Sequence, residues 1–164
     1  MKTLTALVAI AVSAISLTAY ADPTLTVEGV HNCCKKCEKG IVAAVTSVPG
    51  ATVEITKTTV TITAPSEADA KKAAEALGAA GYYGKGIDAP APAASGEAAT
   101  ATVANIHLCC QKCADAINKA ASGVSGVTQS GADKTSKEFV VEGKFSPAEL
   151  QAALLKAGFT CTVK

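Results

Sequence analysis

Two copies of one short string hold most of the residues in this chain that could bind a metal. The strings are HNCCKKC at residues 31–37 and HLCCQKC at residues 107–113. Together they contain both histidines and six of the seven cysteines. Thiolate and imidazole groups are the side chains that bind soft and borderline metal ions best. The chain therefore carries two candidate metal-binding clusters, one after the other.

The spacing within each string suits ligation at the start of a helix. A cysteine there faces unpaired N–H groups and the positive end of the helix dipole, which lower the pKa of its thiol. A Cys-x-x-Cys turn lets both thiols point at one ion, and a further cysteine and a histidine complete a tetrahedral set for Zn(II). Thiolates alone also select Cu(I). The candidate metal ligands are His31, Cys33, Cys34, Cys37, His107, Cys109, Cys110 and Cys113.

Other interpretations of these strings stay open. The Cys-x-x-Cys pairs could be thiol–disulfide redox centres or inert disulfides. His31 and His107 could ligate metal or only form hydrogen bonds within their loops. A Cys₃His set could also be a structural zinc site that serves protein interaction. Cys161 has no counterpart in the first copy and alternates with Phe159 and Val163, so we expect it in the core.

The whole pattern around the strings is repeated. Displaced by 76 residues, the first string and the helix pattern after it align with the second without a gap. Each copy predicts the order βαββαβ, the ferredoxin-like split unit, so the expected class is α/β (α+β) with two such domains in tandem. Ser66 and Ser146 are predicted helix N-caps. The expected strands are residues 25–30, 51–55, 59–63 and 82–87 in the first copy. In the second copy, residues 102–106 are the expected first strand and residues 159–163 the expected last strand.

The ends and the composition narrow the functional class. Lys2, an apolar run over residues 4–17 and the sequence Ala-Tyr-Ala before Asp22 indicate a cleaved secretory signal peptide. The expected protein is thus secreted or periplasmic, with no membrane segment after cleavage. A formal net charge of +1 argues against a nucleic-acid partner. No pattern indicates a catalytic nucleophile with its base, a phosphate-binding loop or paired carboxylates, so we do not expect an enzyme.

Each copy resembles a heavy-metal-associated domain, the fold of copper chaperones and periplasmic mercury- and copper-binding proteins. The resemblance rests on Cys34-Lys35-Lys36-Cys37 and Cys110-Gln111-Lys112-Cys113, each after a short strand that ends in Val30 or Ile106. These two apolar residues replace the family methionine that packs under the loop. The loop is about two residues longer than the family pattern, and the added positions include the histidines and the first cysteines. In the family, an aromatic at the position of Tyr82 and Phe159 shields the metal.

The resemblance implies a division of the chain and a role. The expected units are a signal peptide (1–21), a first metal-binding domain (22–88), an Ala/Pro linker (89–99) and a second metal-binding domain (100–164). Because each copy contains a complete cluster, we expect two metal ions per chain, one in each repeat, either Cu(I) or Zn(II). The expected role is scavenging, buffering or delivery of these ions. A metal transporter or acceptor protein is the expected partner.

Overall fold

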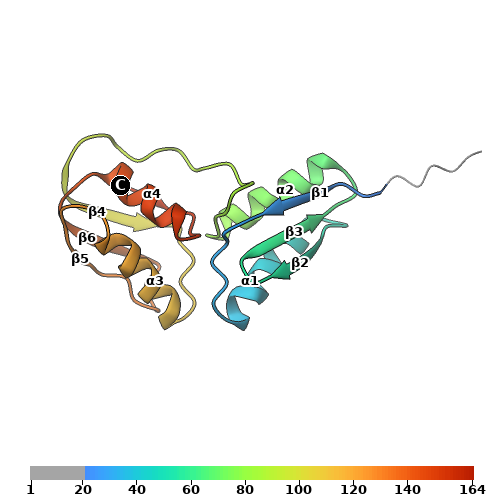
Figure 1. The fold of residues 1–164 in the computed structure, drawn as a ribbon, viewed down its shortest axis with the longest axis horizontal. Helices are drawn as coiled ribbons and strands as arrows, with labels where there is room; N and C mark the ends of the chain where they lie inside the picture. Colours follow the sequence, from blue (N-terminus) through green and yellow to red (C-terminus); the bar gives the residue numbers. More distant parts are fainter. Residues whose placement is uncertain (1–20) are drawn as a thin grey trace, which may run out of the picture.

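The computed structural model describes residues 21–164, so the apolar run of the expected signal peptide lies outside the described residues. Two α/β halves lie side by side, joined by an extended segment that crosses over the second half before it enters the first strand of that half (Figure 1). We call residues 22–88 the first half and residues 98–164 the second half. None of the helices in the described range is long and apolar enough to span a membrane.

The first half contains three strands and two helices. Its elements are β1 (Thr24–Val27), α1 (Lys35–Thr46), β2 (Thr52–Thr56), β3 (Thr59–Thr63) and α2 (Glu67–Ala79). The strands form an antiparallel sheet in the order β1-β3-β2. Threonine, valine and isoleucine alternate along β3, so Val60 and Ile62 face the core while the threonines do not.

The second half contains the complete βαββαβ order. Its elements are β4 (Ala98–Ala104), α3 (Gln111–Ser122), β5 (Val127–Ser130), β6 (Glu138–Phe145), α4 (Pro147–Lys156) and β7 (Thr162–Val163). The antiparallel sheet has the order β5-β6-β4-β7, which places the first and third strands of the unit at its centre. The mixed α/β class predicted from the sequence is confirmed, with four helices and two antiparallel sheets in the described residues.

The predicted last strand of the first half, residues 82–87, is wrong. Only Lys85 pairs with the sheet, exchanging backbone hydrogen bonds of 2.7 and 3.0 Å with Glu28 beyond the end of β1. Gly84 and Gly86 explain why. Gly86 has φ +113°, which breaks an extended run, and a Cβ at Gly84 would lie 2.5 Å from the Glu28 carbonyl oxygen. The segment lies beside β1 without becoming a regular strand.

The predicted strand over residues 159–163 is also shorter than expected, because its first residues pair with the other half. Phe159 forms an antiparallel bridge with Tyr82. The N–H of Tyr83 donates to the Gly158 carbonyl at 2.9 Å, and the N–H of Thr160 donates to the Gly81 carbonyl at 3.1 Å. We call these contacts between residues 81–83 and 158–160 the inter-half ladder. Only Thr162 and Val163 remain to pair with β4.

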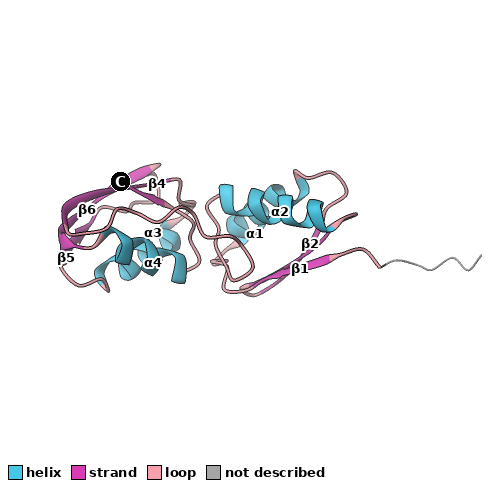
Figure 2. Cartoon of the chain, turned by 90° about the horizontal axis from the view of Figure 1, so that it is seen from above, coloured by secondary structure: helices cyan, strands magenta, loops and turns pink. Residues whose placement is uncertain are grey.

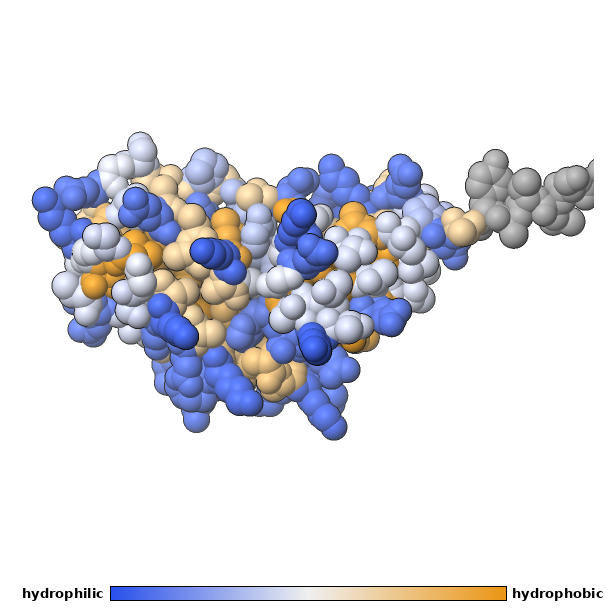
Figure 3. Space-filling view, viewed as in Figure 1, coloured by the Kyte–Doolittle hydropathy of each residue, from blue (hydrophilic) through white to orange (hydrophobic). Residues whose placement is uncertain are grey.

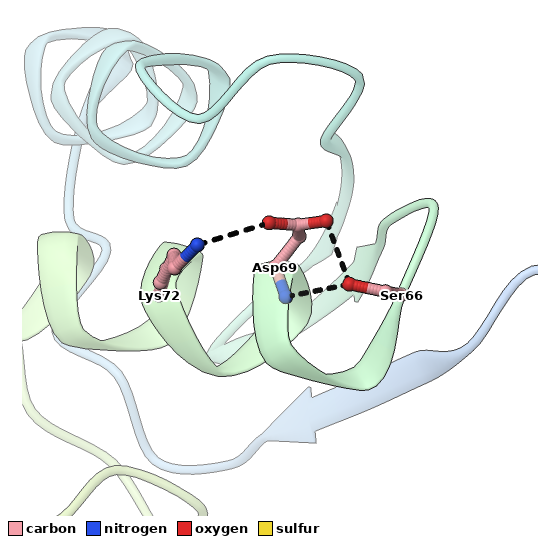
Figure 4. Close-up of polar contacts among 3 residues, drawn as sticks. All are labelled: Ser66, Asp69 and Lys72. Carbon is pink, nitrogen blue, oxygen red and sulfur yellow. Dashed lines mark hydrogen bonds and ion pairs between the residues drawn. The ribbon is translucent and has the colours of Figure 1, made fainter.

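The predicted N-caps are confirmed. The Ser66 hydroxyl accepts from the N–H of Asp69 at 3.1 Å and donates to the carboxylate of the same residue at 2.6 Å (Figure 4). Lys72 lies 3.4 Å from the other carboxylate oxygen. Ser146 accepts from the N–H of Glu149, with Pro147 at the first helical position. Local side-chain chemistry thus defines where α2 and α4 begin.

Each half packs both its helices on one face of its sheet. In Figure 2 the helices of the first half lie above their sheet and those of the second half below theirs, so the halves are turned over relative to each other. Ile41 on α1 and Ile117 on α3 are fully buried against these sheets. The buried apolar residues of both halves form one continuous cluster, which includes Cys37 and Cys113. The protein therefore does not have two separate cores.

The segment predicted as a linker is attached to the second half. β4 begins at Ala98, inside the predicted linker 89–99. The amide of Gln151 on α4 accepts from the N–H of Ala93 at 2.7 Å and donates to the Ala91 carbonyl at 3.0 Å. Gln151 is only 4% exposed, and its amide also reaches the Cys161 carbonyl at 3.4 Å. The connection between the halves is thus held by a buried side chain.

We expect the substitution Gln151→Ala to destabilise the protein by about 1–3 kcal/mol, because it removes the hydrogen bonds of a buried amide to Ala91, Ala93 and the buried Cys161 carbonyl. Gln129→Ala is the matched control, since Gln129 is exposed on β5 and should change stability by no more than about 0.5 kcal/mol. Urea unfolding of the metal-free, reduced protein measures both. Equal stability of the two variants would show that the linker contacts contribute nothing.

Candidate metal centre

Both cysteine strings occupy the same place in their halves, between the first strand and the first helix. Cys34 is the N-cap of α1 and Cys110 the N-cap of α3, both with extended backbone. Cys37 and Cys113 lie one turn further on, where both are fully buried on the core side of their helices. Val30 and Ile106, which precede the strings, are buried below them, as predicted. The helix starts therefore aim the thiols inward.

The helix ends and the burial act on the thiols in opposite directions. A hydrogen bond from the backbone N–H of Cys37 lowers the pKa of Cys34 to about 6. For Cys110 burial raises the pKa, but hydrogen bonds led by the N–H of Cys113 outweigh it and leave that pKa lowered. Burial raises the pKa of Cys33 and Cys109, and it raises that of Cys113 to about 11. The N-cap thiols are thus the readiest to ionise.

The six cysteines of the two strings form a single cluster. Within the first half, Sγ of Cys37 lies 3.6 Å from that of Cys33 and 3.8 Å from that of Cys34. Distances between the halves are as short: 3.8 Å for Cys37–Cys113 and 3.6 Å for Cys37–Cys109. A disulfide bond would need about 2.05 Å, so these are free thiols in contact. The loops that precede α1 and α3 lie next to each other at the junction between the halves (Figure 1).

The remaining contacts between the halves complete this cluster. Cys33 lies 3.7 Å from Cys110 and 3.8 Å from Cys113, and Cys34 lies 3.8 Å from Cys110. Cys161 is 1% exposed and belongs to no group of donors in the described residues, which agrees with its predicted place in the core. The sequence therefore identified the cysteines of the cluster, but it did not predict that the two strings would meet.

The two histidines lie at the edge of the cluster, and each packs against the other half. The ring of His107 stacks on Tyr82 with centroids 4.2 Å apart, and the ring of His31 lies 4.3 Å from that of Phe159. Tyr82 and Phe159 lie beside the candidate ligands, but each covers the histidine of the opposite string. No local sequence signal predicts that each aromatic ring packs on the histidine of the other half, because this contact depends on how the halves pair.

Tyr82 fixes the orientation of His107. The Tyr82 hydroxyl donates to the Cys37 carbonyl at 3.1 Å and lies 2.9 Å from Nε2 of His107. A hydroxyl has one proton, so Nε2–H of the histidine must donate in the second contact. Nδ1 of His107 then keeps its lone pair for a metal, the arrangement usual for metal-binding histidines. Burial lowers the pKa of His107 to about 4, which keeps the ring neutral.

His31 has no such partner, because Phe159 lacks the hydroxyl. Its Nε2 is buried and forms no hydrogen bond within residues 21–164. A buried ring nitrogen without a partner is energetically unfavourable unless a ligand satisfies it. Burial also lowers the pKa of His31, so the ring offers a lone pair at neutral pH. The donor set therefore fits a metal ion on both sides of the cluster.

These side chains form three overlapping groups whose donor atoms all lie within 4.8 Å of one another. The groups are His31, Cys33, Cys37 and Cys113; Cys37, His107, Cys109 and Cys113; and Cys33, Cys34 and Cys110. All eight residues that the sequence suggested as ligands occur in at least one group.

The surface beside the loops is polar. The loops are flanked by exposed Lys35, Lys36, Gln111 and Lys112, and the lower edge of both halves in Figure 3 is mostly hydrophilic.

Residues 102–160 match the family model of the heavy-metal-associated domain. The second half contains one heavy-metal-associated domain. No curated protein matches the chain. Among solved structures, that of the N-terminal soluble domains of Bacillus subtilis CopA is 19% identical, and the match covers 87% of this chain and 94% of that one with a TM-score of 0.31. A TM-score this low does not establish a shared overall structure. Within the heavy-metal-associated domain, α3 carries Cys110 and Cys113 at its start.

Gly40 leaves room for the hydroxyl of Tyr82, and the second half has different residues at both of these positions. A Cβ at Gly40 would lie 2.3 Å from the Tyr82 hydroxyl, so this hydroxyl needs glycine on α1. In the second half the corresponding residues are Ala116 and Phe159, an alanine opposite a ring without a hydroxyl. The extra methyl group and the hydroxyl exclude each other at this position.

We expect Gly40→Ala to destabilise the protein, since overpacking of about 1–3 kcal/mol exceeds the gain of about 1 kcal/mol in helix propensity. In the Tyr82→Phe background the same change should leave the free energy of unfolding unchanged or raise it, because the hydroxyl that clashes with the added methyl group is absent. Denaturant unfolding of wild type, both single variants and the double variant gives the coupling energy. Additive effects would contradict the proposed clash.

Proposed function

We propose that this chain is a metal-binding protein rather than an enzyme, and that it holds soft or borderline metal ions at the six-cysteine cluster. The observation that carries the proposal is the convergence of six thiols and two imidazoles in overlapping donor groups. The heavy-metal-associated domain at residues 102–160 supports the same function. We further propose that the first half is a second unit of this kind, because it presents the same string at the same strand-to-helix turn.

The sulfur geometry suits metals that take thiolates. Four sulfurs about 2.3 Å from a tetrahedral Zn(II) are separated by about 3.8 Å. The nine short sulfur–sulfur distances run from 3.6 to 3.8 Å. Cu(I) prefers the same soft ligands and needs fewer of them. The cluster therefore requires little rearrangement to accept either ion.

We also propose a place and a use for the bound metal. The N-terminal pattern supports export with cleavage after Ala21, and outside the cytoplasm such a protein would scavenge, buffer or deliver metal ions. A metal transporter or an acceptor protein would be the exchange partner. The rival functions are a thiol–disulfide redox protein and a structural zinc module, and the variants below separate them from metal storage.

The N-cap cysteines allow a test that does not depend on folding. Serine is a preferred N-cap residue, so Cys34→Ser with Cys110→Ser should leave the metal-free protein as stable as wild type or up to about 1 kcal/mol more stable. Loss of the two most acidic thiols should weaken Cu(I) binding at least about tenfold. Competition with a Cu(I) chelator under anaerobic, reducing conditions measures affinity, and urea unfolding measures stability.

Cys161→Ala is the control, because it removes a thiol outside every donor group and should leave Cu(I) binding unchanged. Wild-type affinity in the double serine variant would contradict metal binding at the cluster. Loss of the fold on metal removal would favour structural zinc. Rapid oxidation to disulfides with catalysis of thiol exchange would favour the redox protein.

The histidines should affect the choice of metal more than metal binding itself. Zn(II) favours four ligands, so an imidazole that completes a sulfur set matters to it, whereas Cu(I) is satisfied by thiolates. We expect His31→Ala with His107→Ala to weaken Zn(II) binding at least about tenfold and to change Cu(I) binding little. Competitive titration of both metals tests this. Equal losses for the two metals would remove the histidines from the coordination sphere.

A further inference from the structure

The two strings do not provide two separate sets of ligands in this structure. A separate site in the first half would use only residues 31–37, and one in the second half only residues 107–113. Instead, every donor group mixes the halves. His31 and Cys33 are grouped with Cys113, while His107 and Cys109 are grouped with Cys37. The distance from Cys37 to Cys109, 3.6 Å, is shorter than its distance to Cys34 in its own string, 3.8 Å.

We propose that the two strings together hold one multinuclear metal–thiolate cluster, with Cys37 and Cys113 as bridging ligands. This inference rests on the metal-binding function proposed above. The overlap of the groups carries it, because Cys37 and Cys113 each occur in two groups and their sulfurs are 3.8 Å apart. A thiolate sulfur has several lone pairs and can bind two ions at once. The sequence-based expectation of one ion in each repeat is thereby replaced by ions shared between the repeats.

The position of the two bridging residues supports this role. Cys37 and Cys113 are fully buried, whereas the other four cysteines of the cluster are half-buried at its rim. Each bridging residue lies on the first turn of its helix, facing the opposite helix across the junction. Cys33 also occurs in two groups, which links the third group, Cys33, Cys34 and Cys110, to the rest. The three groups therefore describe three neighbouring ion positions.

Charge balance favours several ions over one in each half. When a thiol binds a metal ion it loses its proton to solvent, so full ligation of six cysteines leaves six negative charges in a partly buried site. The basic side chains beside the loops, Lys35, Lys36 and Lys112, are exposed and reach solvent rather than the cluster. Two Cu(I) ions would offset only two of these charges, and each further ion offsets one more.

Contacts outside the cysteine cluster also join the two halves. The inter-half ladder joins the backbones on one side of the cluster. The ring pairs Tyr82–His107 and Phe159–His31 cross the junction in opposite directions. A cluster built between two surfaces that already pair loses little conformational entropy when it binds ions.

Two variants of the same Cys-x-x-Cys turn give a direct test. Cys34 belongs to one donor group and Cys37 to two. If each half held its own ion, Cys34→Ser and Cys37→Ser would be equivalent, and each would abolish the first site and spare the second. For a shared cluster, Cys37→Ser should retain only about half as much Cu(I) as Cys34→Ser. The reason is that Cys37 serves two donor groups and Cys34 only one, so its loss weakens two ion positions.

The probe is Cu(I) supplied under anaerobic conditions to the full-length mature chain, with copper and protein measured after gel filtration. Wild type should take up more than two Cu(I) per chain, and Cys113→Ser should reproduce the loss seen with Cys37→Ser. Far-UV circular dichroism of the metal-free variants reports whether the buried substitutions fold. X-ray absorption on copper-loaded wild type needs no variant, and it should show a copper–copper scattering path.

The outcomes separate this inference from the function on which it rests. A wild-type capacity of two Cu(I), equal losses in Cys34→Ser and Cys37→Ser, and no copper–copper path would overturn the shared cluster while leaving metal binding intact. A wild-type protein that binds no Cu(I) would overturn both. A copper–copper path in wild type that disappears in folded Cys37→Ser would establish the bridging role.

Discussion

The inter-half ladder between residues 81–83 and 158–160 is the contact that decides where every candidate ligand lies. It depends on Gly81 and Gly158, which follow the ends of α2 and α4 with φ +89° and lie against the backbone of the opposite half. A Cβ at Gly81 would lie 2.4 Å from the backbone nitrogen of His107, and one at Gly158 would lie 2.5 Å from that of His31. These glycines therefore end a helix and also admit the opposite metal loop. This close approach lies beside the place where the two cysteine strings meet.

The cluster balances two opposing physical demands. Its position within a continuous apolar core disfavours charged thiolates, which is why burial raises the pKa of Cys33, Cys109 and Cys113. The helix starts favour the charged form at Cys34, where hydrogen bonds lower the pKa to about 6. Metal cations bound at the proposed site would resolve this conflict, because they would replace the protons and neutralise the sulfur charges together. Cys33, Cys109 and Cys113 thus favour the protonated form, while the lowered pKa values of Cys34 and Cys110 favour their thiolates.

The sequence predicted what local chemistry decides. The serine caps, the helices that begin at the Cys-x-x-Cys turns and the core position of Cys161 all follow from residue types and spacing over a few positions. It failed where one half acts on the other. The strand expected over residues 82–87 carries the right β-forming residues, but Tyr82 pairs with Phe159 of the second half instead. An internal repeat shows that two units are alike and says nothing of which surfaces they present to each other. One sequence signal for this contact was present, because a glycine precedes an aromatic residue on both sides of the ladder. The periodicity of apolar residues does not show that these two sites pair with each other.

The difference between Tyr82 and Phe159 makes the two sides of the cluster unequal. His107 is oriented by the Tyr82 hydroxyl, so its free nitrogen is already directed by a hydrogen bond before any metal arrives. His31 packs on a ring that cannot accept a hydrogen bond, and its buried Nε2 is left without a partner. The first side is therefore preorganised, while the second has an unsatisfied group that a ligand would relieve. The glycine at position 40 and the alanine at position 116 keep this difference in place, because only the first leaves room for a tyrosine hydroxyl. The repeat has thus diverged at the pair of residues that sets how each histidine is held, while both copies keep the same candidate ligands.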